Sequence, residues 1–268
     1  MGREQVVQRV ELATDVSVAF VEQGDRMGPA VVLLHAWGES LGSFDRLTPM
    51  LPEALHVFAL DQRGHGAADK PADGYDLATL GEDVTAFMDA VGLPSAVLVG
   101  SSSGGYVAQQ TAVMHPDRVT GLVLVGSPKT LRGRALFADE VTRLTDPIDP
   151  VRVRTFLESF PLFHDVPDPY VADRVNDMVR MPARVWRSSL TGLTTSPAPI
   201  DSGEISALTM LLWGDRDGLL TREDQEDLAA RISGSRLLVY EGVGHLVLWE
   251  QPERVAADLV SFIQDLTS

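Results

Sequence analysis

The chain alternates between short unbroken apolar runs and longer stretches in which apolar residues recur every three or four positions. The unbroken runs predict strands that are buried on both faces, and the periodic stretches predict amphipathic helices. We expect the strands at residues 30–35, 56–60, 96–99, 121–125, 207–213 and 236–240. This alternation is typical of an α/β fold, with a mostly parallel central sheet and helices on both faces.

A hairpin and several helices complete this expected core. Residues 6–12 and 16–21 are rich in β-forming residues, and Thr14-Asp15 between them favours a turn. Helices are expected at residues 44–51, 77–91, 103–115, 222–232 and 252–266. The first of these should end at Pro52, because proline cannot continue a helix.

The strand pattern is interrupted after residue 128 and resumes only near residue 206. Between these points the chain carries amphipathic segments separated by prolines, which predict short helices. These segments lie at residues 135–144, 151–160, 170–181 and 184–193. We therefore expect a core domain made of residues 1–127 and 206–268, with a helical lid inserted at residues 128–205.

The amino-acid composition excludes several classes of binding partner and of site chemistry. The 268 residues are 44% hydrophobic, and the net charge of −16 argues against binding to nucleic acid or to anionic membranes. There is no cysteine, which excludes disulfides, thiolate metal sites and a cysteine nucleophile. Neither a signal peptide nor an apolar run of about 18 residues is visible, so we expect a cytoplasmic protein. Whether it is a monomer or a homodimer is left open.

The segment Gly100-Ser101-Ser102-Ser103-Gly104 has the G-x-S-x-G pattern of a nucleophile elbow. It directly follows a predicted strand and opens a predicted helix, so we expect Ser102 to be the nucleophile. A second match, centred on Ser40, lies in a polar loop five residues after its strand. We interpret Ser40 as a helix-capping or turn residue.

A serine nucleophile needs an adjacent base, which in turn needs a group that orients it. Of the six histidines, His245 follows the last predicted strand, where the loops of a parallel sheet gather. The loop after the preceding strand contains Asp215 and Asp217, either of which could orient the histidine.

With these motifs in place, the chain resembles the α/β-hydrolase superfamily over nearly its whole length outside the lid. Ser, Asp and His follow one another in the order usual for that fold. His35-Ala36-Trp37-Gly38 looks like the family's H-G-x-G oxyanion loop, with alanine in place of glycine, and Asp61-Gln62-Arg63-Gly64-His65-Gly66 looks like its D-x-R-G-x-G turn.

The resemblance implies roles for several residues. The acid would be Asp217, with Asp215 as the alternate, and the oxyanion hole would consist of the backbone N–H groups of Trp37 and Ser103. We expect neither a metal nor a cofactor. The remaining polar residues of the two loops are expected to hold those loops in place, and they are His35, Asp61, Arg63 and His65.

Aromatic residues of the lid predict an apolar substrate pocket. We expect Trp186 and Phe160 to line it together with Trp37 and Leu246. The leading hypothesis is a serine hydrolase that cleaves a small to medium hydrophobic carboxylic ester or lactone. Hydrolysis of C–C bonds, cofactor-free perhydrolysis and ligand sensing by an intact triad are alternatives on the same fold. Haloalkane dehalogenases and ordinary epoxide hydrolases are disfavoured, because they carry aspartate where Ser102 stands.

Overall fold

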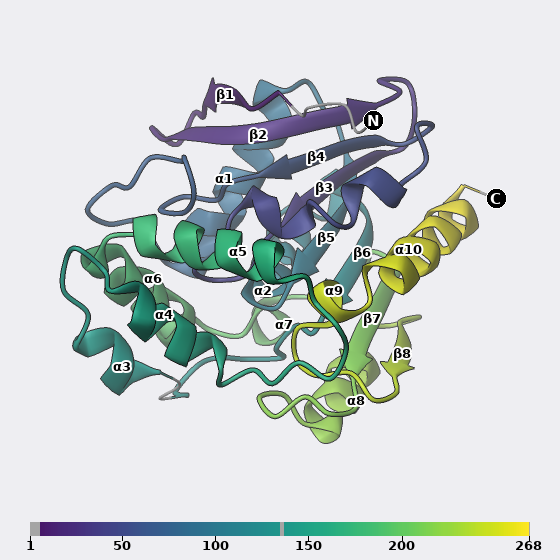
Figure 1. The fold of residues 1–268 in the computed structure, drawn as a ribbon. Helices are drawn as coiled ribbons and strands as arrows, with labels where there is room; N and C mark the ends of the chain where they lie inside the picture. Colours follow the sequence, from purple (N-terminus) through teal and green to yellow (C-terminus); the bar gives the residue numbers. More distant parts are fainter. Residues whose placement is uncertain (1–5, 135–136, 268) are drawn as a thin grey trace.

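The computed structural model describes residues 6–134 and 137–267, and within them the chain forms an eight-stranded sheet (Figure 1). Its order is β1-β2-β4-β3-β5-β6-β7-β8. The strands are β1 (Gln8–Glu11), β2 (Ser17–Gly24), β3 (Ala30–Leu34), β4 (His56–Leu60), β5 (Ala96–Ser101), β6 (Val119–Val125), β7 (Thr209–Gly214) and β8 (Arg236–Tyr240).

The sheet is parallel from β4 to β8, and only the opening hairpin of β1 and β2 runs antiparallel to its neighbours. The predicted α/β class, the mostly parallel sheet and the hairpin are thereby confirmed. Because parallel strands end at one edge, the loops that follow β3, β5, β7 and β8 gather there.

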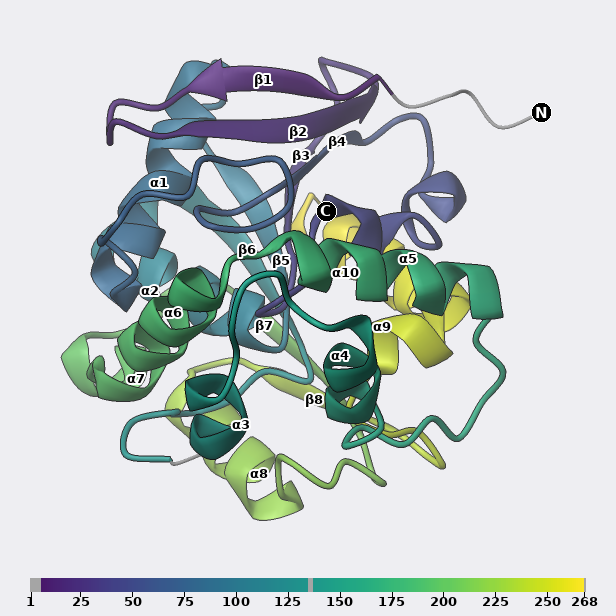
Figure 2. The same ribbon diagram turned by 60° about the vertical axis from the view of Figure 1, so that its left-hand side comes forward.

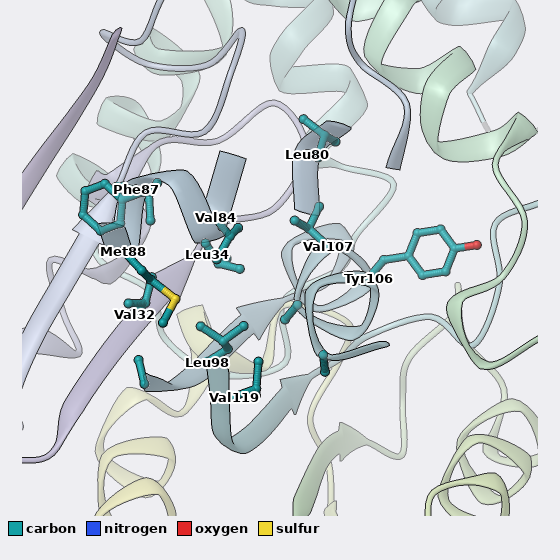
Figure 3. Packing of buried hydrophobic residues seen from close by; sticks show 14 of the residues in the cluster. Val32, Leu34, Leu80, Val84, Phe87, Met88, Leu98, Tyr106, Val107 and Val119 are labelled. Carbon is teal, nitrogen blue, oxygen red and sulfur yellow. The ribbon is translucent and has the colours of Figure 1, made fainter. Parts of the chain in front are cut away.

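Successive residues of the central strands enter two different cores, as the pleat of a strand requires. Val32 and Leu34 of β3 pack in one cluster with helices α1 and α2, whereas Val31 and Leu33 pack in another with helices α9 and α10. Figure 3 shows the first cluster, where Leu80 and the neighbouring residues of α1 meet the strands and α2. Burial on both faces explains why these strands are continuous apolar runs in the sequence.

Five helices of the described core cover the sheet, and four of them lie close to predicted ranges, whereas α9 was not predicted. They are α1 (Leu77–Ala90), α2 (Ser103–Met114), α8 (Arg222–Arg231), α9 (Val247–Glu250) and α10 (Pro252–Leu266). Three short 3-10 segments, η1 (Leu41–Phe44), η2 (Thr48–Met50) and η3 (Pro116–Arg118), also form. The helix predicted at residues 44–51 is wrong. η1 ends at Phe44, and only the three-residue η2 follows, with Pro49, which has no N–H to donate, in its first turn.

Between β6 and β7 the chain forms α3 (Ala138–Thr142), α4 (Pro150–Leu157), α5 (Asp168–Arg180), α6 (Ala183–Thr195) and α7 (Pro199–Ser202). We refer to residues 128–205 as the insertion. Helices were predicted in four of these places, although residues 135–136 of the first lie outside the described residues. The insertion helices α3 to α6 stand to one side of the sheet (Figures 1 and 2). Part of the insertion packs in a small cluster of buried residues that also includes Tyr75.

No helix within residues 6–134 and 137–267 is both long and apolar enough to cross a membrane.

Candidate active site

Ser102 lies on a sharp turn between β5 and α2. Its φ of 48° and ψ of −118° are unusual for a residue with a side chain, and such backbone strain is frequent at functional sites. Two glycines permit the turn. A Cβ on Gly100 would lie 2.3 Å from the Cα of Gly105, and one on Gly104 would lie 2.2 Å from the carbonyl oxygen of Leu34. The strand and the helix can therefore approach closely only with glycine at both positions.

Ser102, His245 and Asp217 form a continuous chain of contacts. The Oγ atom of Ser102 lies 3.0 Å from Nε2 of His245, and Nδ1 of the same ring lies 2.8 Å from Oδ2 of Asp217. The other oxygen of Asp217 accepts backbone N–H groups from Leu219 and Leu220, at 2.7 and 3.0 Å. These bonds fix the carboxylate, which in turn fixes the imidazole with Nε2 toward the serine.

The second aspartate of the same loop serves the backbone. Asp215 accepts the N–H of Gly242 through Oδ1 at 2.7 Å, and its own N–H donates to Tyr240 at 3.1 Å. It therefore ties the loop after β7 to the loop that carries His245. The structure brings Asp217, and not Asp215, against the histidine.

Two further residues position His245, and sequence reasoning missed the role of one of them. The ring of Phe160 stacks on the imidazole, with centroids 5.4 Å apart. The buried Glu250 accepts the N–H of Gly244 at 2.8 Å and that of Phe163, in the insertion, also at 2.8 Å. The one available signal for Glu250 was an acidic residue at the end of the apolar stretch 246–249.

The loop after β3 brings its backbone to the elbow. The N–H of Trp37 donates to Oγ of Ser103 at 2.6 Å, so this predicted oxyanion donor is engaged by the residue that follows Ser102. Gly38 has a φ of +83°, and a Cβ there would lie 2.7 Å from the ring of Trp186. Ala36, where the family usually has glycine, contributes to the wall of the site.

Ala36, Trp37 and Ser103 are among the residues that line a small cavity of about 70 Å³. Its sheet side holds Trp37, Ser102 and His245, and its insertion side is formed mainly by apolar residues. Ligand pockets usually have roughly 300–1,000 Å³, so this cavity accepts a small group unless the insertion moves. The apolar residues from the insertion include Phe137, Phe156, Leu157, Phe160, Met178 and Leu190.

Three of the four residues predicted to bind substrate line this cavity, namely Trp37, Phe160 and Leu246. The fourth, Trp186, requires a correction. It lies behind Trp37, with ring centroids 4.7 Å apart in an edge-to-face arrangement, and it belongs to the core of the insertion. Trp186 was expected in the pocket as an aromatic residue of the insertion, but its ring packs against Trp37 and the other insertion helices.

Glu39 is a buried acid in the cavity wall that sequence reasoning did not single out. Its side chain accepts a hydrogen bond from the Ser43 hydroxyl, and the residue is 3% exposed. Burial raises the pKa of the Glu39 carboxyl, whereas the Ser43 hydrogen bond and the Arg174 guanidinium act in the opposite direction. The available signal was its position, directly after the oxyanion loop.

The polar residues of the 61–66 turn support the loops as expected. Asp61 accepts the backbone N–H groups of Leu41 and Ala67, each at 2.7 Å, and burial raises its pKa. Arg63 pairs with Asp83 through two bonds of 2.6 and 2.8 Å.

Two buried histidines lie beside each other under the Trp37 loop. His35 accepts the N–H of Gln62 at 3.0 Å through Nε2, and burial holds its pKa well below the usual value. Burial also lowers the pKa of His65 to about 4. Among the described residues no group of three or more His, Cys, Asp or Glu is arranged to hold a metal ion.

Ser40 occupies the place predicted for it. Its side chain caps η1 by accepting the N–H of Gly42 at 3.2 Å, and its hydroxyl donates to Asp177 of the insertion at 2.6 Å. The prediction of a capping serine is confirmed.

Comparisons with known proteins agree with this geometry. A family model described as alpha/beta hydrolase fold matches residues 29–252. The chain is 26% identical over 247 residues to 3-oxoadipate enol-lactonase 2 of Acinetobacter baylyi, which covers 90% of this chain and 91% of the relative. It is 28% identical over 253 residues to a pimeloyl-[acyl-carrier protein] methyl ester esterase of Neisseria meningitidis, covering 87% and 92% of the two chains.

A solved structure is similar over the whole molecule. An esterase from Exiguobacterium antarcticum superimposes with a TM-score of 0.85 and 25% identity, covering 97% of this chain and 100% of that one. The match of the family model to most of the sequence, together with the sheet order and the strained serine turn, leads to one conclusion. The chain belongs to the alpha/beta hydrolase fold family.

Proposed function

We propose that this hydrolase cleaves small to medium hydrophobic carboxylic esters or lactones through an acyl-enzyme on Ser102. The observation that carries the proposal is the chain of contacts from Ser102 through His245 to Asp217, at 3.0 and 2.8 Å. The names of a lactonase and an ester-cleaving relative support the ester class.

The geometry supports a two-step mechanism. Nε2 of His245 takes the proton of the Ser102 hydroxyl as Oγ attacks the carbonyl carbon, and it then gives that proton to the leaving alkoxide. Water attacks the acyl-enzyme with the same histidine as base, which releases the acid and restores Ser102. Asp217 holds the tautomer with the proton on Nδ1 and stabilises the imidazolium that forms in each step.

The oxyanion would be stabilised by the backbone N–H groups of Ser103 and Trp37. Loss of one such donor typically costs on the order of 10²–10³ in rate. Because Ser103 Oγ accepts the Trp37 N–H at 2.6 Å, the substrate oxygen must share this donor or displace the hydroxyl.

We propose that the insertion, residues 128–205, acts as a lid on a core formed by residues 1–127 and 206–268. Support comes from the cavity wall, where Phe160 of the insertion stacks on His245. The apolar wall favours uncharged, hydrophobic groups, and its small volume favours a short acyl chain.

Labelling with a fluorophosphonate tests the proposal directly. The reagent should attach to Ser102, as peptide mass spectrometry would show, and the labelled protein should lose hydrolysis of p-nitrophenyl acetate and of a small lactone. The mechanism would be refuted if the reagent attached to another residue in preference to Ser102. It would also be refuted if ester hydrolysis survived full labelling of Ser102.

A further inference from the structure

Glu39 places a carboxyl group at the edge of an otherwise largely apolar cavity. Within the part of the chain that the structure describes, its carboxyl accepts one hydrogen bond, from the Ser43 hydroxyl to Oε2. Oε1 has no hydrogen-bond partner there, and Glu39 lines the same cavity as Ser102 and His245. Among the described lining residues, Glu39 alone carries a carboxyl group.

The Glu39 carboxyl is not needed to neutralise the charge of Arg174. The Arg174 side chain, which enters from α5, lies 3.1 Å from Asp177 and 3.7 Å from Asp45. It also donates to the carbonyl oxygen of Gly42. Two other carboxylates therefore balance its charge, and Glu39 can serve the cavity.

We infer that Glu39 determines specificity, by accepting a hydrogen bond from a hydroxyl group of the substrate and by excluding substrates that carry a carboxylate. This inference rests on the proposed ester hydrolysis. Among the described residues, Oε1 is not one of the fully enclosed polar atoms that lack a partner, so a ligand hydroxyl can reach it. A hydrogen bond to a carboxylate contributes more than one between two neutral groups. A carboxylate in the same place would meet the like charge of the ionised Glu39.

An uncharged donor fits the site better than an ammonium group. Glu39 is buried, and burial disfavours charge in this wall, while the Arg174 guanidinium nearby would repel a second cation. A hydroxyl can donate to the carboxyl in either of its protonation states. The expected substrate is therefore a hydroxylated, otherwise apolar ester.

The test compares three esters of nearly equal size in each of two series. On the alcohol side they are the n-propyl, 2-hydroxyethyl and carboxymethyl esters of butyric acid. On the acyl side they are methyl butanoate, methyl 3-hydroxypropanoate and monomethyl malonate. Base uptake gives kcat/KM for each ester, and intrinsic reactivity cancels when each ratio is compared between wild type and variant.

In at least one series, Glu39→Leu should lower the ratio of hydroxyl to alkyl ester by about tenfold or more, mostly through KM. Glu39→Gln keeps an acceptor oxygen and nearly the same shape, so it should retain the hydroxyl preference within about threefold. The same variant should raise the relative rate of the carboxylate ester. Asp45→Asn is the matched control, because it removes a carboxylate beside Arg174 without touching the cavity, and it should leave both ratios unchanged.

Two outcomes overturn the inference. If both Glu39 variants keep the wild-type ratios in both series, Glu39 does not contact the substrate. If Asp45→Asn changes the ratios as Glu39→Leu does, the effect belongs to the Arg174 cluster. Failure of the proposed function would give a different result, because no ester would then be hydrolysed in a Ser102-dependent manner. In that case the inference about Glu39 is refuted as well.

Discussion

The two walls of the cavity are built in different ways. On the sheet side, hydrogen bonds to backbone groups fix the reactive residues, as when Leu219 and Leu220 hold the carboxylate of Asp217. On the insertion side, aromatic rings meet edge to face, for example Phe156 and Phe160 at 5.3 Å. Backbone bonds fix angles, whereas apolar contacts fix mainly volume. Chemistry should therefore be sensitive to the sheet side, and substrate preference to the insertion.

The largest expected effect separates the two serines that share one sequence pattern. Ser102→Ala should lower kcat by about 10⁴-fold or more while the protein stays folded, because the nucleophile is lost. Ser40→Ala removes only a cap and a contact with Asp177, so kcat should stay within about threefold. Rates with p-nitrophenyl acetate, together with thermal unfolding, provide the measurement. If Ser40→Ala lowered kcat far more than Ser102→Ala, the nucleophile would be Ser40 and not Ser102.

The two aspartates of the loop after β7 sharpen the comparison within the sheet side. Asp217→Asn should reduce kcat by about 10³–10⁴-fold, because the amide no longer fixes the tautomer of His245. Asp215→Asn should reduce it by less than about tenfold, because that side chain bonds only the Gly242 backbone. Steady-state kinetics of both variants decide the matter. Equal losses of kcat in the two variants would mean that the conformation of the loop, and not the contact of Asp217 with His245, sets the rate.

The insertion side should respond mainly through binding. Phe160→Ala removes a ring from the cavity wall, so KM for a bulky ester should rise by about tenfold with a smaller change in kcat for a short acetate.

Trp186→Ala is the contrasting variant, because this ring packs behind Trp37 in the core of the insertion. It should cost about 3–5 kcal/mol of stability and leave the ratio of the two esters closer to wild type. Thermal unfolding and kcat/KM for both esters test the pair. If Phe160→Ala kept the wild-type ratio of kcat/KM between the bulky and the short ester, the insertion would not contribute to substrate preference.

The smallest effect concerns the buried polar support of the sheet side. The pKa of His65 is about 4 in the folded protein and near 6.5 when unfolded. Unfolding therefore takes up a proton between these values, so the contribution of His65 is complete above about pH 6.5 and is lost as the pH falls toward 4.

His65→Gln removes this titration. Its Tm should fall less between pH 7 and pH 4.5 than that of the wild type, by a few degrees. Calorimetry at several pH values makes the comparison. Parallel pH profiles for the two proteins would show that His65 takes no part in acid destabilisation, which would then rest on other groups such as His35.

The sequence by itself determined the order of strands and helices. Runs such as residues 30–34 and 121–125 are typical of strands buried on both faces, as in a parallel sheet covered by helices, and this pattern is local. The same topology predicted which loops meet, because parallel strands end at one edge. Ser102, His245 and the loop of the acid could therefore be selected from sequence, whereas the choice of Asp217 over Asp215 came from the resemblance to the family. The structure brings Ser102, His245 and Asp217 together.

Other features were decided only by the tertiary structure. The sequence marks Trp186 as an aromatic residue of the insertion but does not say which way its ring points. The neighbouring insertion helices decide that it packs behind Trp37 and not in the cavity. The contact of Trp37 with the Ser103 hydroxyl and the placement of Glu39 depend on side-chain rotamers and on loop conformation. Such features arise from contacts between residues far apart in the chain, and a one-dimensional pattern carries no information about those contacts.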